Sequence, residues 1–514
     1  MGLWKKTNPR RSQVRKNISA ERFSRISRLA NTDSLVSILI WLIFVVFCTL
    51  ILSIPQAGIV EAAPIAVIVV LISLAGALYI YHFQKRITKN RARALVLAGL
   101  FILLLAATRL LALSTGETFW ATGTAVTTAI IMTIAYDQRF AIGMSIFYCL
   151  FACLAVGPME SKLTDIHLFL AMATGAVTCC FCLKEIRTRI KLLQVSTLAA
   201  IIVFITAAAL NFLFQELNTA DIIRDSALHA GITLVVGVLI QGLLPLIEKT
   251  FRIATSMTLL DYSDANQKLL KRLHMEAPGT FSHSLLIGSI AEAAAEAIGR
   301  NGLLCRVGAY YHDIGKINKA NYFIENELGS ASRHKELSPT MSHLIIVGHV
   351  KDGIEMAKEY GLPSVLRQFI ETHHGTTLIE HFYNEAKKQK TKNSKGKITD
   401  APAESEFRYP GPKPRIKEAA IVMLVDTVES AVRSLPEVTP TKIEAVVHNM
   451  SMKRLQDGQF DECDMSLREL SQIEASISKT LAAHYHGRIA YPKPPDEPPE
   501  TESRAEQKEQ KNNK

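Results

Sequence analysis

Long apolar runs crowd the first half of this 514-residue chain and constrain its fold more than any other feature. They fall within residues 33–251, and about 20 consecutive apolar residues are enough for a helix to cross a bilayer. Eight runs qualify as candidate spans, at residues 34–54, 59–83, 95–114, 118–136, 140–157, 166–183, 192–214 and 227–249. The sequence therefore predicts a polytopic bundle of about eight transmembrane helices over residues 33–250.

The charges between these runs predict how the bundle is oriented. Residues 1–32 carry nine Lys or Arg and one acid, and the loops at 84–93 and 184–191 are also basic. The alternate loops hold few basic residues, and basic loops stay on the cytoplasmic side. We therefore expect a multi-pass protein of the cell (inner) membrane, with both the N-terminal segment and residues 250–514 in the cytoplasm. The net charge of +11 then reflects orientation in the lipid bilayer, which argues against a nucleic acid polymer as a partner.

Polar residues inside the spans have simple explanations. Arg109 lies near the outer end of its span, where its side chain is expected to snorkel towards the interface. The spans contain no run of acids or histidines that would indicate a proton relay, so transport is disfavoured.

The second half of the chain has the pattern of a helical domain outside the membrane. A charged amphipathic stretch at residues 251–276 predicts a linker helix, which Pro278-Gly279 ends. Helical patterns follow at about 282–298, 303–314, 339–359, 363–372, 415–434, 439–456 and 465–483. Strand-like alternation is almost absent, so we expect an all-α domain at residues 277–495.

Three polar segments complete this organisation. Residues 1–32 form a basic N-terminal segment, and the Lys-, Ser- and Pro-rich residues 384–413 are expected to be a solvated loop within the domain. Residues 496–514 are rich in Glu and Lys, which predicts a disordered tail.

Histidines and aspartates with metal-ligand chemistry are scattered over the helical domain. His312-Asp313 places an imidazole beside a carboxylate, whose two oxygens can bridge two metal ions. Asp426 lies in an otherwise apolar run, where a carboxylate is costly to bury unless it is paired or bound to a cation. Further candidates are His283, His349, His373 and His374. Together, five His and two Asp spaced over five helices predict a metal centre.

The order His-Asp, His, His-His, Asp resembles that of the HD metal-dependent phosphohydrolase superfamily. The flanking words are more specific, and they are Glu276–Thr280, His312–Lys316, Ile345–Gly353, His373–Thr377, Phe407–Pro414 and Met423–Asp426. These words are similar to those of the seven-transmembrane-HD family, whose PgpH-type members are membrane cyclic-di-AMP phosphodiesterases. The resemblance covers roughly residues 190–495, and the earlier spans more loosely.

The resemblance implies a two-metal site at the end of a membrane bundle. Its ligands would be His283, His312, Asp313, His349, His373, His374 and Asp426. Asp313 would bridge the two divalent ions as a catalytic residue, and Lys316 would lie near the scissile phosphate. Iron or manganese are the implied ions, and hydrolysis of cyclic di-AMP to 5′-pApA is the implied reaction. The sequence itself contains nothing that selects adenine over guanine, and it leaves a homodimer open.

Other functions stay open at this point. The domain could be an HD-type nucleotide phosphohydrolase with another substrate, such as a deoxynucleotide or guanosine tetraphosphate, although the flanking words disfavour this. It could also be a nucleotide-binding membrane receptor that does not hydrolyse, which a complete set of ligands disfavours. One departure from the family is clear, because residues 55–62 replace the large extracytoplasmic domain that usually follows the first span.

Overall fold

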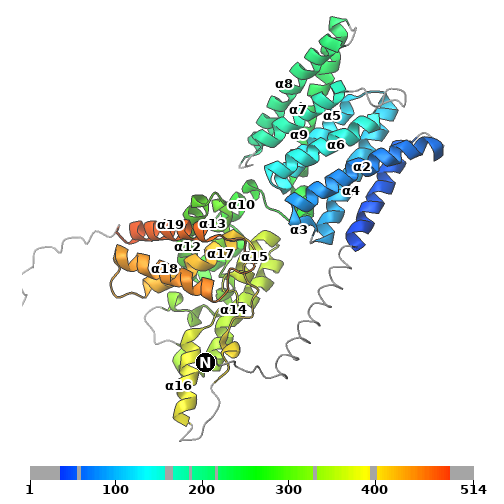
Figure 1. Cartoon of the computed structure of the whole chain (residues 1–514). Coiled ribbons are helices and arrows are strands. Elements are labelled where there is room, and N and C mark those ends of the chain that lie inside the picture. Colours follow the sequence, from blue (N-terminus) through cyan, green and yellow to red (C-terminus); the bar gives the residue numbers. More distant parts are fainter. Residues whose placement is uncertain are drawn as a thin grey trace, which may run out of the picture. The chain divides into compact units, whose positions relative to one another are not determined.

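The computed structural model describes residues 35–54, 59–88, 90–156, 166–183, 188–214, 218–327, 333–393 and 402–486. The predicted basic segment at 1–32 and the predicted tail at 496–514 lie outside these residues. The chain forms two compact units, Met1–Tyr262 with Pro363–Val365, and Ser263–Leu362 with Leu366–Lys514 (Figure 1). Within the described ranges every element of regular secondary structure is a helix, and one isolated β-bridge joins Leu378 to Arg408. The all-α prediction is confirmed.

Each of the eight predicted spans is a helix of the first unit. These helices are Leu35–Ser53, α2 (Ile59–Phe83), α4 (Arg91–Thr115), α5 (Phe119–Ala135), α6 (Gln138–Val156), α7 (Ile166–Cys182), α8 (Arg189–Phe214) and α9 (Thr219–Phe251). A single turn, α3 (Lys85–Thr88), precedes α4. Six of the eight are long and apolar enough to cross a membrane, whereas α5 and α7 have 17 residues each. A 17-residue helix rises about 25 Å, slightly less than the hydrocarbon core of a bilayer.

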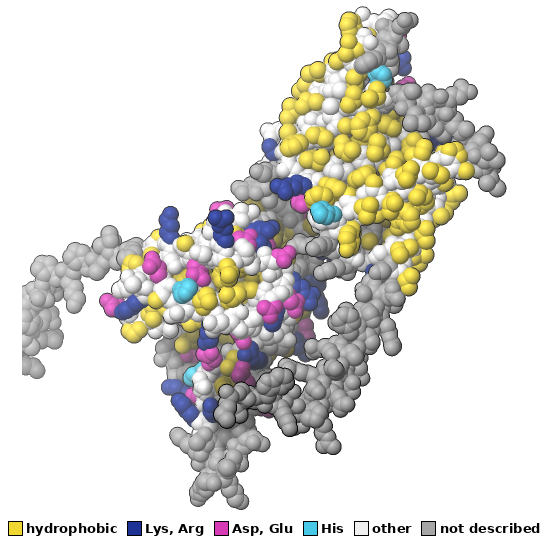
Figure 2. All heavy atoms as spheres, in the orientation of Figure 1, with side chains coloured by type: hydrophobic (Ala, Val, Ile, Leu, Met, Phe, Trp, Pro, Cys, Tyr) yellow, Lys and Arg dark blue, Asp and Glu magenta, His cyan; other side chains and the backbone are white. Residues whose placement is uncertain are grey.

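The surface of the first unit is suited to lipid. Its helices expose large apolar side chains, among them Leu71 at 61% and Phe212 at 77%. Figure 2 shows hydrophobic side chains over most of the described face of this unit, whereas acids and bases are interspersed on the second unit. Because a water-soluble surface rarely exposes so large an apolar area, this pattern supports membrane insertion of the first unit.

Arg109 is buried inside the bundle and does not snorkel, contrary to the prediction. Only 5% of it is exposed, and its guanidinium donates to the carbonyl oxygens of Ile54 and Ala155. These carbonyls lie at the C-terminal ends of the Leu35–Ser53 helix and α6, where backbone oxygens lack partners within their own helix. The Arg109 guanidinium therefore finds its hydrogen-bond acceptors at these helix ends, and not in the water at the membrane interface as the sequence analysis predicted.

The predicted linker helix at 251–276 is interrupted. Helix α9 ends at Phe251, because Arg252 adopts a left-handed conformation with φ of 53°. The chain then forms α10 (Ser256–Ser263) and, after a turn in which the Asp264 side chain accepts from the Asn266 amide, α11 (Lys268–Glu276). The Glu248 carboxylate near the end of α9 accepts from the amide and hydroxyl groups of Thr255 and Thr258, which fastens α10 to α9.

The second unit is a helical domain built around α17 (Lys417–Arg433). Residues Ala419 to Val425 of this helix are almost fully buried. The other elements are α12 (Pro278–Ala297), α13 (Gly302–Tyr311), η1 (Ile314–Tyr322), η2 (Ile324–Asn326), η3 (Arg333–Glu336), α14 (Pro339–Glu359), α15 (Ser364–Thr372), α16 (Glu380–Asn393), η4 (Glu404–Phe407), α18 (Pro440–Gln456) and α19 (Leu467–His486). Helices α12, α13, α18 and α19 pack against α17 and form the apolar core.

Residues 384–413 are not a solvated loop throughout, which corrects the prediction. Helix α16 continues to Asn393, and the chain returns through η4 with Phe407 only 2% exposed. The Phe407 ring lies 6.0 Å from that of Tyr383, centroid to centroid. The contact between Tyr383, just before this segment, and Phe407 within it therefore brings the two ends of the segment together.

Candidate metal centre

The structure brings all seven predicted ligands together in the second unit. They come from α12 (His283), the end of α13 (His312 and Asp313), α14 (His349), the end of α15 (His373 and His374) and α17 (Asp426). Asp426 Oδ1 lies 3.9 Å from His312 Nε2, although the two residues are more than a hundred positions apart, and His349 Nε2 lies 3.3 Å from Asp313 Oδ1. Helix packing thus assembles a cluster whose members span more than a hundred residues.

Asp313 belongs to two groups of candidate ligands at once. Asp313, His349, His373 and His374 form one group, and His283, His312 and Asp313 form the other. Oxygen Oδ1 of Asp313 lies 3.3 Å and 3.4 Å from the Nε2 atoms of His349 and His373, while Oδ2 lies 3.0 Å from His312 Nε2. Since each oxygen faces a different group, the carboxylate is positioned between two candidate cation positions.

The backbone orients three of the imidazoles towards the interior of the cluster. The Nδ1 atoms of His312, His349 and His373 each lie against a carbonyl of the preceding helical turn, at 2.6 Å, 2.5 Å and 3.0 Å. Because a carbonyl can only accept, we assign the proton to Nδ1 and a lone pair to each Nε2. Backbone carbonyls thus fix the tautomer that a metal ligand requires.

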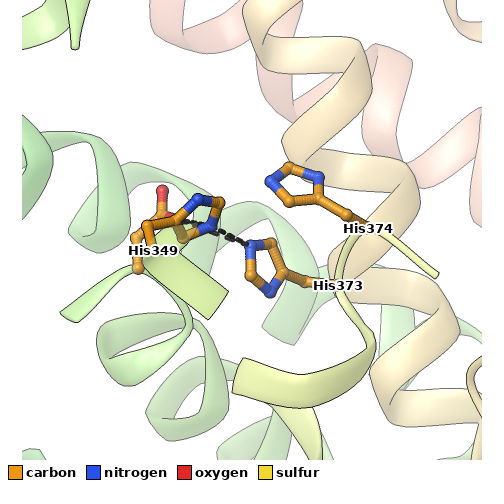
Figure 3. A group of neighbouring side chains, drawn as sticks. His349, His373 and His374 are labelled. Carbon is orange, nitrogen blue, oxygen red and sulfur yellow. Dashed lines mark hydrogen bonds and ion pairs between the residues drawn. The ribbon is translucent and has the colours of Figure 1, made fainter. Parts of the chain in front are cut away.

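The inward-facing atoms fit a cation. The Nε2 atoms of His349 and His373 are 3.1 Å apart (Figure 3), and two lone pairs at that distance repel each other unless a positive charge lies between or beside them. Among the described residues, buried His312 Nε2 and Asp313 Oδ1 have no hydrogen-bond partner. Imidazole and carboxylate donors of this kind suit divalent transition metals.

Glu429 is a member of the cluster that the sequence analysis missed. Its carboxylate lies 2.9 Å from Nδ1 of His283, whose Nε2 is 3.1 Å from Asp426. Burial opposes protonation of His283, but the hydrogen bonds to Asp426 and Glu429 outweigh it and raise the pKa of His283 to about 9. Glu429 lies one turn after Asp426 and is 2% exposed, so the argument applied to Asp426 would also have identified it.

Lys316 and Glu325 support the Asp313 carboxylate. The Lys316 ammonium lies 2.7 Å from Asp313 Oδ2 and 2.7 Å from Glu325 Oε1. Burial opposes ionisation of Asp313, but His312 and Lys316 outweigh it and hold the pKa of Asp313 well below its usual range. Lys316 thus keeps Asp313 charged, and Glu325 is a second partner that no motif indicated.

Three side chains of the cluster are the most accessible to solvent. The His374 side chain is 21% exposed, that of Lys316 12% and that of Asp426 10%, whereas the other four histidines and Asp313 are 2% exposed or less. The Tyr409 ring stacks on His374 with centroids 4.2 Å apart. Burial lowers the pKa of His374 well below its usual value, and the neighbouring His373 and His349 add to this, so His374 is neutral at the opening.

Removing the Glu429 carboxylate should loosen His283. We expect Glu429→Ala to weaken metal binding by about 10–100-fold, because a histidine ligand loses the acceptor that orients its ring. Glu429→Gln keeps an acceptor oxygen and should recover part of the loss. Glu418→Ala, three turns earlier on α17, is the control. Metal titration of the purified protein gives the affinities, and equal affinities for all three variants would contradict this role.

Comparison with known proteins agrees with this architecture. Residues 59–255 match a family model described as "7TM receptor with intracellular HD hydrolase", and residues 280–431 match that of the HD domain. A membrane helix bundle followed by an HD domain with a His/Asp cluster defines the class that these two models describe, and this chain matches both of them in that order. HD domains bind divalent metals.

Two curated relatives are cyclic-di-AMP phosphodiesterases named PgpH. The protein of Bacillus subtilis (strain 168) is 43% identical over 312 residues, which cover 59% of this chain and 42% of the relative. That of Listeria monocytogenes is 42% identical over 251 residues, covering 49% of this chain and 34% of the relative. The chain thus spans less than half the length of these relatives. The crystal structure of the L. monocytogenes PgpH HD domain with cyclic-di-AMP is 43% identical, with a TM-score of 0.40, and covers 43% of this chain and 100% of its own.

Proposed function

We propose that this protein is a membrane-anchored, metal-dependent phosphodiesterase that hydrolyses a cytoplasmic cyclic dinucleotide, cyclic di-AMP to 5′-pApA. One observation carries the proposal, namely the buried Asp313 carboxylate shared by two groups of inward-facing ligands. The identity to PgpH proteins supports cyclic di-AMP as the substrate. The basic loops at residues 84–93 and 184–191 support a cytoplasmic location for the HD domain.

The seven residues His283, His312, Asp313, His349, His373, His374 and Asp426 would hold two divalent ions, iron or manganese. Such a pair supplies positive charge for the phosphodiester and an activated nucleophile at neutral pH.

The protein's own residues have separable roles in this reaction. Asp313 would join the two ligand groups, and Lys316 would keep it ionised while adding positive charge at the rim of the opening. The phosphodiester would enter beside His374, the most exposed member of the cluster. Tyr409 would hold the His374 ring by stacking on it, so that the ring does not swing into the opening.

A substrate panel tests the proposed reaction. The purified full-length protein, loaded with manganese or iron, should convert cyclic di-AMP to 5′-pApA, detected by nucleotide chromatography. Cyclic di-GMP, guanosine tetraphosphate and deoxynucleotides form the comparison set. Cleavage of one of these without cleavage of cyclic di-AMP would indicate an HD-type nucleotide phosphohydrolase. Tight binding of cyclic di-AMP without any cleavage would indicate a receptor.

Metal uptake should release a proton near neutral pH. The pKa of His283 is raised to about 9, so in the metal-free protein this imidazole is protonated at pH 7. Burial lowers the pKa of His349 to about 3, so that ring is already neutral. Binding of manganese at His283 should therefore strengthen as pH rises towards about 9 and release about one proton at pH 7.

Titration calorimetry in two buffers with different ionisation enthalpies measures this proton. Equal apparent enthalpies at pH 7 would mean that no proton leaves and that His283 does not bind the ion. Glu429→Gln serves as a comparison, because loss of this carboxylate's charge should lower the pKa of His283 and reduce the number of protons released.

A further inference from the structure

A polar cavity lies inside the membrane unit, separate from the metal centre. It has a volume of about 360 Å³ and lies where the α4–α5 turn, the start of α7, the end of α8 and the start of α9 meet. Cavities of a few hundred Å³ accommodate small molecules. The cavity is at the end of the bundle where α9 begins, whereas α9 leaves the bundle for the second unit at its other end.

The charges of the cavity wall are predominantly negative. Three carboxylates line the cavity, those of Glu117, Asp221 and Asp225, together with one guanidinium, that of Arg224. All three carboxylates lie outside the apolar runs at 95–114, 118–136 and 227–249, at the end of the bundle where α9 begins. An excess of carboxylates favours a positively charged ligand.

Two buried polar side chains orient this wall. Asn211 and His229 are 5% and 4% exposed, and both line the cavity. Asn211 donates to Asp225 Oδ2 at 2.7 Å, and His229 Nδ1 lies 2.7 Å from the Thr122 hydroxyl. His229 Nε2 pairs with the Thr118 hydroxyl at 3.4 Å, so both ring nitrogens of His229 have a partner. Asp225 Oδ1 has only the 3.9 Å contact with His229 Nε2 among the described residues, so Asn211 holds this carboxylate in place while one of its oxygens can still accept a hydrogen bond.

The geometry favours an organic cation over a metal ion. Among the described residues, groups of three or more His, Cys, Asp or Glu with converging ligand atoms occur only at the HD centre. The cavity carboxylates are spread over its wall, and an ammonium group has three donors that can reach separate acceptors. Charge-assisted hydrogen bonds of this kind are among the strongest available in a partly buried site.

We propose that this cavity binds a small compound that carries an ammonium group, with Asp225 and Glu117 as its acceptors. Arg224 pairs with a carboxylate of the same compound if that compound is a zwitterion, as α-amino acids are. The proposal does not depend on the reaction catalysed by the HD domain. In the orientation predicted from the basic loops, the cavity lies on the outer side of the membrane.

Ligand-induced thermal shifts of the full-length protein in lipid nanodiscs test the site. The probes are glycine, L-alanine, L-serine, putrescine and methylamine, with glycerol as the uncharged control. At least one ammonium probe should raise the unfolding temperature of the wild-type protein, whereas glycerol should not. Asp225→Asn and Glu117→Gln should each weaken binding of that probe at least about tenfold, because a charged acceptor is lost.

Asp137→Asn is the matched control, since Asp137 lies at the opposite end of the same bundle and asparagine preserves its cap on α6. Arg224→Gln separates the two ligand classes, because it should weaken binding of the amino acids and spare putrescine and methylamine. Size-exclusion profiles check that each variant is folded. The proposal is overturned if no ammonium probe shifts the wild-type protein at millimolar concentration, or if well-folded Asp225→Asn and Glu117→Gln both bind as tightly as Asp137→Asn.

Discussion

Asp313→Ala is expected to release both metal ions and to reduce turnover by at least about 10³-fold. The expectation follows from Asp313 being the one residue common to both candidate ligand groups. Metal-ion catalysis supplies several kcal/mol of transition-state stabilisation, and about 1.4 kcal/mol corresponds to a factor of ten in rate. Elemental analysis of the purified variant and its rate of cyclic di-AMP hydrolysis are the two measurements.

A surface carboxylate provides the control for this variant. Glu355 lies on α14, its side chain is 66% exposed, and its ion pair within the described residues is with Lys351, at 4.0 Å. Glu355→Ala should keep both metal content and rate. If Asp313→Ala also kept them, the seven-ligand assignment would be wrong, whatever reaction the domain catalyses.

Gly315→Ala should destabilise the domain on the order of 3 kcal/mol, because the backbone of η1 touches that of α14 at this residue. A Cβ at position 315 would lie 1.8 Å from the carbonyl oxygen of His349 and 2.5 Å from the amide nitrogen of Gly353. Both are backbone atoms, so relief requires η1 and α14 to separate. That separation would also pull Asp313 away from His349, so metal binding should weaken in parallel.

Thermal unfolding measures the loss, and a decrease of roughly 6–12 °C is expected for a domain of this size. Gly348→Ala, on α14 beside His349, is the control. A Cβ there would meet only the tip of Lys319, at 3.8 Å, and alanine is the better helix former. Equal unfolding temperatures for Gly315→Ala and the wild type would refute the close approach of the two backbones.

Much of the fold could be predicted because hydrophobic length and period are local properties. Apolar runs gave the eight helices of the first unit, and the helical period gave the main helices of the second. Asp426 was identifiable as a site residue for a physical reason, since a carboxylate inside an apolar helix needs a partner. Its contacts with His283 and His374 are of that kind.

Other features depend on tertiary contacts that no local pattern encodes. The interruption after Phe251 depends on the backbone conformation of one arginine, Arg252. Arg109 found its acceptors in two other helices, and Glu325 reaches Lys316 from a short 3₁₀ turn. Glu429 is the instructive case, because it directly follows Val428, the last residue of the apolar run that contains Asp426.

Helix α9 is continuous from the cavity to the attachment of α10, so a movement at one of these places displaces the other. Asp225 at the cavity and Glu248 at the α10 attachment are separated by 23 residues of one helix, or about 35 Å of axial rise. Tilting such a rod by about 5° displaces its far end by roughly 3 Å, which is comparable to the helix shifts that switch other proteins. Because Glu248 accepts hydrogen bonds from Thr255 and Thr258, the displacement of that end of α9 would carry α10 with it.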